Sequence, residues 1–234
     1  MEPALINKNP LHFITDSDMD IIEELHRLHR TKPISNAQLL NYYKEVPISG
    51  AATSIRFDED KIFCRTNETQ SRAISLCKDT FVSFTGLPHD IHAKAHFCTE
   101  SMEVTLSDLT LVKVAAIKRS SIRVRMHIPH SVIVEAGPHK VNGRLFDISL
   151  AGCAINISDH TPLGTFTHMQ IQLTVPLKTG APPVTVRVAA ILSKTFQENK
   201  LYTCIFMFDH NKSSEDQIGK IVAMRQMEII RELK

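Results

Sequence analysis

Several features are scarce in this sequence, and each scarcity excludes a class of protein. The 234 residues include only 8 glycines and 11 prolines, which excludes collagen-like and low-complexity architectures. No apolar run approaches the ~20 residues that a helix needs to cross a bilayer. The first residues, MEPALINKNPLHF, lack the charged and apolar regions of a secretory signal. We therefore expect a soluble globular protein of one or two domains, without membrane insertion.

Cysteines are few and irregularly spaced. The five of them, Cys64, Cys77, Cys98, Cys153 and Cys204, form an odd set without a C-x-x-C pair, and each lies in apolar sequence. A disulfide framework or a zinc site would show paired spacings. We expect reduced thiols in the core of a cytosolic protein.

Charge of either sign is not in excess. The chain has 27 Lys and Arg against 25 Asp and Glu, which leaves a net charge of +2 and a pI near 8.3. Bulk attraction to nucleic acid or anionic lipid is therefore not expected, and anion binding has to come from local clusters. Only 6% of residues are aromatic and none is Trp, so few side chains can stack on bases. This weakens an interpretation as a nucleic-acid-binding β-barrel.

Catalytic motifs are also missing. The sequence contains no G-x-S-x-G, P-loop or G-x-G-x-x-G, and no nucleophile with a recognisable base. His89, His92 and His96 have a spacing that suits a metal on a helix, but the flanking sequence has a β pattern. His26 and His29 form an H-x-x-H pair that we interpret as surface or core histidines. We predict no enzymatic activity, no cofactor and no metal.

The N-terminal part combines two predicted helices with a run of strands. Thr15 begins an acidic stretch that favours a helix N-terminus, and apolar spacing extends this helix to about Arg30. A second helix is predicted from Ser35, where Gln38 completes a capping box and Leu39, Leu40, Tyr42 and Tyr43 form the apolar face. From Ile48 the period changes to that of strands, including RAISLCKDTFVSFTG. Residues 46–117 therefore suggest a small antiparallel β-barrel, split-barrel-like, or a sandwich.

The C-terminal part reads as a second β domain. Between Asp108 and Glu135 there is no acidic residue, and the domain boundary is placed there. Short, turn-punctuated strand candidates then predict a barrel or sandwich of six or seven strands. Ser214 and Gln217 form a capping box for a last helix, whose apolar residues suit core cover or, alternatively, a homodimer or partner surface. The prediction is a mainly β protein with domains at residues 1–117 and 118–234, the second comprising a linker at 118–125, a barrel at 123–210 and a helix at 213–233.

The first motif is the basic stretch Lys118-Arg119-Ser-Ser-Ile-Arg123-Val-Arg125. Arginine presents a planar fork of donors that matches phosphate oxygens and the acceptor pair of guanine. Two arginines four residues apart can clamp a ligand with several phosphates. Taken alone, such a stretch is usually a solvated linker.

The second motif is Asp147-Ile-Ser149-Leu-Ala-Gly152. A carboxylate only accepts hydrogen bonds, so Asp147 suits the adjacent N–H donors on the Watson–Crick edge of guanine. A serine hydroxyl can bind phosphate, and glycine permits close backbone approach. Taken alone, these residues are also those of an ordinary β-turn.

The two motifs in this order resemble the PilZ domain, the bacterial receptor module for cyclic di-GMP. The resemblance rests on Arg119, Arg123, Asp147, Ser149 and Gly152, and covers residues 118–234. It implies a six-stranded β-barrel in which the two arginines hold phosphates and guanine, Asp147 reads guanine, and Ser149 with Gly152 lines the phosphates. Cyclic di-AMP is not expected to bind, because adenine has no N1–H for Asp147.

Two departures from the family pattern are visible. Lys118 stands where the family often has another arginine, which leaves open whether one or two ligands bind. Tyr202-Thr-Cys204-Ile-Phe206 stands where the family often has a G-x-x-F-like strand, a change that concerns barrel packing more than the ligand.

The two-domain layout also resembles the flagellar-brake (YcgR-like) architecture. That resemblance implies a cytoplasmic receptor in which ligand binding at the linker reorients the domains and acts on a protein partner, in the flagellar motor or the polysaccharide machinery. The alternative is a degenerate PilZ-type adaptor that does not need the ligand. Intact Arg119, Arg123, Asp147 and Ser149 argue against the adaptor.

Overall fold

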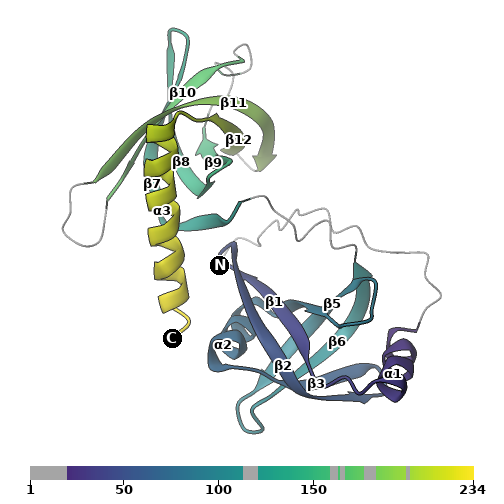
Figure 1. Ribbon diagram of the computed structural model, residues 1–234. Helices are drawn as coiled ribbons and strands as arrows, with labels where there is room; N and C mark the ends of the chain where they lie inside the picture. The colour runs from purple at the N-terminus through teal and green to yellow at the C-terminus, as the bar shows by residue number, and fades with distance from the viewer. Residues whose placement is uncertain (1–19, 113–120, 159–162, 164–166, 177–182, 199–200) are drawn as a thin grey trace. The chain divides into compact units, whose positions relative to one another are not determined.

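The computed structural model describes residues 20–112, 121–158, 163, 167–176, 183–198 and 201–234. Among these, residues 20–43 and 47–112 belong to one compact unit, and residues 121–232 belong to a second. Each unit contains a closed barrel of six antiparallel strands (Figure 1). The predicted mainly β fold is confirmed, including the six-stranded C-terminal barrel and its closing helix.

The N-terminal barrel has the strand order β1-β2-β3-β6-β5-β4. Its strands are β1 (Ala37–Tyr43), β2 (Val46–Asp58), β3 (Lys61–Arg65), β4 (Asp79–Ser83), β5 (Asp90–Cys98) and β6 (Glu103–Val112). Helix α1 (Ile21–Thr31) begins at Asp20, whose carboxylate accepts from the backbone N–H groups of Ile22 and Glu23. Side chains that alternate along the strands fill the barrel, because successive strand residues point to opposite faces.

The helix predicted from Ser35 is wrong, because this segment is strand β1. Its buried positions are Ala37, Leu39 and Asn41, which is a period of two, and Leu39 pairs with Val82 across the β1–β4 ladder. The four apolar residues Leu39, Leu40, Tyr42 and Tyr43 are compatible with the period of a helix and with that of a strand. Pairing with a strand some forty residues further along the chain selects the extended form.

A second helix does exist, but it lies in a segment that was predicted to be strand. Helix α2 (Glu68–Cys77) begins after Asn67, whose side chain caps the backbone N–H of Gln70, and ends at Lys78 in the left-handed conformation. Gln70 is buried and donates to Asn41 of β1, which ties the helix to the barrel. Asn67, a favoured N-cap residue, is the feature of the sequence from which this helix could have been predicted.

The C-terminal barrel has the strand order β10-β11-β12-β9-β8-β7. Its strands are β7 (Arg123–Ala136), β8 (His139–Ser149), β9 (Gly152–Ile157), β10 (Met169–Val175), β11 (Val184–Glu198) and β12 (Leu201–Asp209). Two strand candidates of the sequence, VRMHI and SVIVEAG, are one strand, β7, whose pairing with β8 shifts register between Arg125 and His130. Cys204 and Phe206, in the strand that departs from the family pattern, are buried in this unit.

Helix α3 (Lys212–Arg231) contacts β7, β8 and β11 (Figure 1). Its capping box is formed by Asn211 and Ser214, one turn earlier than the predicted Ser214–Gln217 pair. Ile218, Ile221, Val222 and Ile229 are buried against the barrel, as expected for core cover. Met227 is 50% exposed, so the apolar residues of α3 extend beyond its buried face.

All five cysteines are free thiols. Burial raises the pKa of Cys64 to about 12 and that of Cys77 to about 11, and it raises the pKa values of Cys153 and Cys204. Cys98 differs, because hydrogen bonds from Ser101 lower the pKa of its half-buried thiol. Core placement therefore describes Cys64, Cys153 and Cys204, whereas Cys77 and Cys98 are only half-buried.

The histidines considered above as metal ligands lie on a strand or directly before it, and on helix α1. His92 and His96 belong to strand β5, and the β pattern predicted around them is confirmed. His26 and His29 of α1 place their rings edge-on against Phe57. Within the described part of the chain, no three His, Cys, Asp or Glu side chains gather closely enough to hold a metal ion. In the same residues no helix is both long and apolar enough to cross a membrane.

Candidate functional site

The second motif occupies a tight hairpin between β8 and β9. Ser149 and Gly152 face each other in the ladder, and Leu150 and Ala151 form the turn between them. The Ser149 hydroxyl donates to the Gly152 carbonyl at 3.1 Å. The interpretation of this motif as a β-turn is therefore correct, and Ser149 and Gly152, two of the residues proposed to bind the ligand, flank the turn.

Gly152 has a structural role that the sequence did not indicate. A Cβ atom built at this position would lie 2.0 Å from the carbonyl oxygen of Phe206 and 3.2 Å from the Cα of Met207. Residue 152 pairs with Met207 in the β9–β12 ladder. Any side chain larger than hydrogen would push β12 away, so glycine is required by the approach of a neighbouring strand.

Strand pairing brings the first and second motifs together. Arg123 at the beginning of β7 pairs with Ser149, and Arg125 pairs with Asp147. Between them, Val124 and Ile148 are fully buried in the barrel. Because strand residues alternate, Arg123, Arg125, Asp147 and Ser149 share the opposite, outer face of the β7–β8 ladder.

Asp147 and Arg123 form the charged centre of this face. An Arg123 Nη1 lies 3.7 Å from an Asp147 Oδ2, and the two side chains are 37% and 7% exposed, respectively. This is a diagonal cross-strand contact, within reach of long side chains. At 3.7 Å the pair is held by charge, without a hydrogen bond between these two atoms. A shielded carboxylate thus lies next to a half-exposed guanidinium on the barrel surface.

The charges of Asp147 and Arg123 both affect the pKa of the Cys153 thiol, which follows Gly152 at the end of the hairpin. Burial raises the pKa of Cys153 well above its ordinary value, the Asp147 carboxylate raises it further, and the Arg123 guanidinium lowers it. Burial thus disfavours the thiolate of Cys153, the form in which a cysteine acts as a nucleophile.

The second arginine of the strand is engaged differently. The Arg125 guanidinium lies over the ring of Phe146, with its Cζ 4.4 Å from the ring centroid, in a cation–π contact. Phe146 is at the point where the β8–β9 register shifts between Leu145 and Asp147. Sequence reasoning missed this aromatic residue, because a phenylalanine in a strand is ordinarily part of the core.

A buried arginine of α3 also reaches this strand. Arg225 is only 4% exposed, and its Nε donates to the carbonyl oxygen of Arg125 at 2.8 Å. Its Nη1 pairs with Glu228 at 2.8 Å. Burial and the Arg225 charge lower the pKa of His130 on β7, which Glu228 partly offsets. No sequence signal marked Arg225, because an arginine within a helix usually belongs to its solvent-exposed face.

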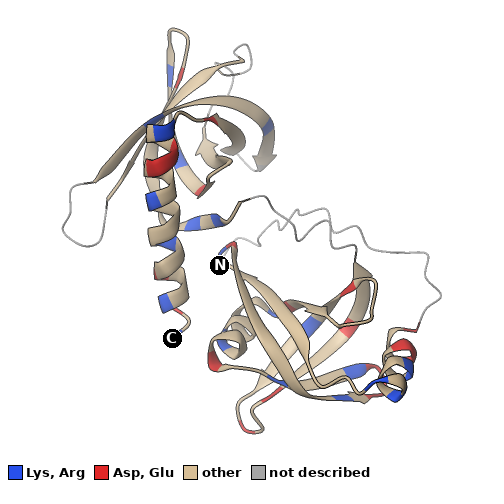
Figure 2. Cartoon of the chain, viewed as in Figure 1, with Lys and Arg blue, Asp and Glu red and all other residues tan. Residues whose placement is uncertain are grey.

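Not every predicted site residue can be placed. Lys118 and Arg119 lie outside the described residues. Arg123, Asp147, Ser149 and Gly152 lie close together on β7, β8 and β9, as the family resemblance implied. Arg123 and Arg125 lie at the beginning of β7, where Figure 2 shows blue positions.

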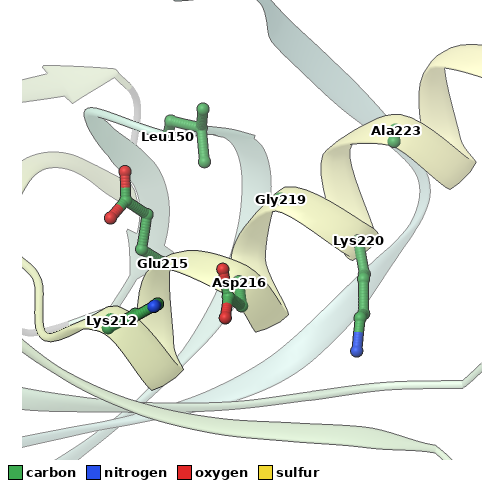
Figure 3. Close-up of a pocket in the computed structure, with 7 residues that line it drawn as sticks. All are labelled: Leu150, Lys212, Glu215, Asp216, Gly219, Lys220 and Ala223. Atoms are coloured by element: carbon green, nitrogen blue, oxygen red, sulfur yellow. The ribbon is translucent and has the colours of Figure 1, made fainter.

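A shallow open hollow adjoins the hairpin turn (Figure 3). Leu150, from the turn, forms one wall, and α3 forms the other. The α3 residues that line it are Lys212, Glu215, Asp216, Gly219, Lys220 and Ala223. The lining includes two lysines, Lys212 and Lys220, and two acidic residues, Glu215 and Asp216. Their charges cancel, so the hollow by itself does not favour binding of a polyanion.

Comparison with known proteins identifies similarity in the same region. Residues 117–224 match the family model described as PilZ domain. Among solved structures, the chain is similar to the inhibitor of motility MotI/DgrA of Bacillus subtilis, with 10% identity, a TM-score of 0.42 and coverage of 83% of this chain and 97% of that one. No curated protein matches the sequence.

Two further solved structures are similar at comparable levels. YcgR of Escherichia coli in complex with c-di-GMP is 13% identical, with a TM-score of 0.41 and coverage of 90% of this chain and 91% of that one. The K. pneumonia MrkH–c-di-GMP complex is 15% identical, with a TM-score of 0.39 and coverage of 90% and 95%. These values are low, so the functional argument depends on the family match and on the residues of the site.

Proposed function

Since residues 117–224 form a PilZ domain, we propose that this protein is a receptor for cyclic di-GMP that acts by binding and catalyses no reaction. Its ligand-binding residues are Lys118, Arg119, Arg123, Asp147, Ser149 and Gly152. The observation that carries this proposal is the juxtaposition of the Arg123 guanidinium, the Asp147 carboxylate and the Ser149 hydroxyl on the outer face of the β7–β8 ladder. We also propose domain boundaries at residues 1–117 and 118–234.

The chemistry of these groups suits a cyclic diguanylate. Asp147 accepts from the N1–H and the exocyclic N–H of one guanine, which adenine cannot reproduce. Arg123, at 37% exposure, is free to turn its planar fork towards a phosphate or a guanine edge. Lys118 and Arg119 add positive charge from the preceding segment, and Ser149 contributes a hydroxyl. Gly152 keeps the hairpin in place and leaves its outer side open.

A calorimetric titration with cyclic di-GMP tests the proposal. The wild-type chain is expected to bind, and Arg123→Ala is expected to bind at least about tenfold more weakly, because it loses charge-assisted hydrogen bonds. Arg56→Ala is a matched control, because Arg56 is an exposed arginine of the N-terminal unit that pairs with Glu103. Cyclic di-AMP should give no heat.

Different outcomes separate the receptor from the adaptor. Absence of heat with every cyclic dinucleotide would leave the motifs vestigial and favour the ligand-independent adaptor. Equal binding by wild type and Arg123→Ala would remove Arg123 from the site while retaining a receptor. The fitted stoichiometry decides between one and two ligands, the question that Lys118 raises.

The receptor is proposed to act in the cytoplasm. Ligand binding would reorient its two domains and so change how it binds a protein partner of the flagellar motor or the polysaccharide machinery. The exposed apolar residues of α3 are proposed, alternatively, to form a homodimer. A ligand shifts such an equilibrium only through different contacts in the two states, and cationic residues of the linker would supply them. Small-angle scattering is expected to change on saturation with cyclic di-GMP. Superimposable profiles with and without ligand would exclude reorientation and leave binding unaffected.

A further inference from the structure

The β12–α3 junction contacts the second motif directly. The two turn residues, Leu150 and Ala151, present their carbonyl groups to the end of β12. The backbone N–H of Phe208 donates to the Ala151 carbonyl at 3.0 Å, and the His210 ring Nε2 bonds the Leu150 carbonyl across sixty positions of the chain. Both carbonyl groups of the hairpin turn are therefore held by the segment that leads into α3.

His210 also contacts the N-terminus of α3. Its Nδ1 lies 3.4 Å from the hydroxyl of Ser214, which is one half of the α3 capping box. Since a carbonyl oxygen only accepts, the ring donates through Nε2 to Leu150. Nδ1 lies beside the Ser214 hydroxyl, which donates to the Asn211 carbonyl at 3.0 Å. The ring packs edge-on against Phe208, with 5.3 Å between the centroids. One side chain thus links the motif turn to the helix cap.

Arg225 forms the corresponding link further along α3. Strand β7 leaves its partner β8 directly after Arg125, since the next paired residue is His130. Pro129, within the unpaired stretch, has no N–H to offer. Arg225 donates its Nε to the Arg125 carbonyl at the point where this pairing ends, and Arg125 is two residues from Arg123. The helix therefore holds the end of the paired segment that carries the first motif.

The two hydrogen bonds connect the start and the second half of α3 to the two motifs, His210 to the hairpin turn and Arg225 to β7. His210 precedes α3, and Arg225 lies about 20 Å from the start of the helix, whereas Arg123 and Ser149 pair directly in the β7–β8 ladder. A displacement of either motif on ligand binding would change a hydrogen bond that leads to α3. By reciprocity, a variant that alters these bonds differently in the ligand-free and ligand-bound states changes the affinity for the ligand.

We infer that α3 is the element that responds to the ligand, and that His210 and Arg225 are positioning residues that couple it to the two motifs. The inference depends on the proposed function for the identity of the ligand, and on the observed hydrogen bonds for the coupling. It assigns to α3, and to the hollow between Leu150 and Gly219, the surface whose geometry changes between the ligand-free and ligand-bound states (Figure 3).

Four variants of the full chain test this inference by calorimetry with cyclic di-GMP. His210→Phe keeps a ring against Phe208 but loses the donor. Arg225→Lys keeps a cation beside Glu228 but loses the Nε donor. Each is expected to bind roughly five- to tenfold more weakly, the value of about one hydrogen bond. His210→Gln restores a donor and should bind within about threefold of wild type. Met227→Gln, on the exposed face of α3, should bind like wild type.

Hydrogen exchange gives the readout that a merely structural role would not produce. In the wild type, saturating cyclic di-GMP is expected to slow amide exchange in α3. In His210→Phe and Arg225→Lys, ligand at saturation should protect the motif residues while α3 exchanges as it does without ligand. Unchanged affinities in both variants, or no effect of ligand on α3 of the wild type, would overturn the inference.

A failure of the proposed function gives a different result. If the wild type binds no cyclic di-GMP, the receptor function fails, and the positioning roles are judged on the ligand-free exchange rates. His210→Phe must then accelerate exchange around residues 149–152, and Arg225→Lys around residues 123–126. Rates equal to those of the wild type would overturn the positioning roles as well.

Discussion

Replacement of Asp147 by Asn is expected to weaken cyclic di-GMP binding by about 30- to 100-fold. The amide retains the shape of the carboxylate, but loses its charge and places an N–H₂ group where an acceptor is needed. Hydrogen bonds to a charged group contribute about 1.5–3 kcal/mol each, and 1.4 kcal/mol corresponds to a tenfold change in affinity. The side chain is only 7% exposed, so water does not easily replace the lost interaction.

The measurement is a titration of Asp147→Asn with cyclic di-GMP, next to circular dichroism that checks the barrel. Asp58→Asn, an exposed change in the N-terminal unit, is the matched control and should bind like wild type. Affinity within about threefold of wild type, a difference below the value of one hydrogen bond, would show that Asp147 does not contact guanine. The role of the carboxylate would then lie in its contacts within the barrel, including the one with Arg123.

Substitution of Gly152 by Ala is expected to lower the free energy of unfolding of the C-terminal barrel by about 3 kcal/mol. The added Cβ would lie 2.0 Å from the Phe206 carbonyl oxygen, a distance that requires a strand to move. Since Gly152 pairs with Met207, the β9–β12 ladder would have to open at that position. Differential scanning calorimetry should show a transition lowered by roughly 10–20 °C.

Gly219→Ala is the matched control, with the opposite expected sign. A Cβ at this position meets nothing nearer than Leu150 Cδ2 at 3.8 Å, an ordinary contact. Alanine within a helix is favoured over glycine by about 0.5–1 kcal/mol, so this variant should be slightly more stable. Wild-type stability of Gly152→Ala combined with lost cyclic di-GMP binding would contradict the packing role. It would show instead that Gly152 faces the ligand.

The residues of the candidate site could be proposed from the sequence, because the chemistry of its motifs is local. Arginine forks, an acceptor-only carboxylate and a tight turn can be recognised from residue types and their order. What each residue does in the fold was less predictable. Gly152 was expected to make room for a ligand, yet the first atom that needs this room belongs to Phe206, on another strand. His210 and Arg225 carried no motif at all.

The two errors in secondary structure have one physical cause. The apolar run at Leu39–Tyr43 satisfies the period of a helix and that of a strand, and so does the segment around Ala73 and Ile74. In β1 the choice is made by pairing with β4, and in α2 by the Asn67 cap and by packing on the barrel. Short segments of this kind obtain their stability from contacts rather than from their own propensity.

The sequence by itself determined that this is a mainly β protein with a closing C-terminal helix, that two motifs typical of a PilZ domain occur in order, and that no recognised catalytic motif is present. Composition, periodicity and residue chemistry are properties of neighbouring residues, so they can be read along the chain. Only the tertiary structure decided that Asp147 is shielded on the outer face of the barrel, and that Arg225 meets a carbonyl group 100 positions away. Such contacts depend on which strands close the barrel, and that is set by the packing of the whole core.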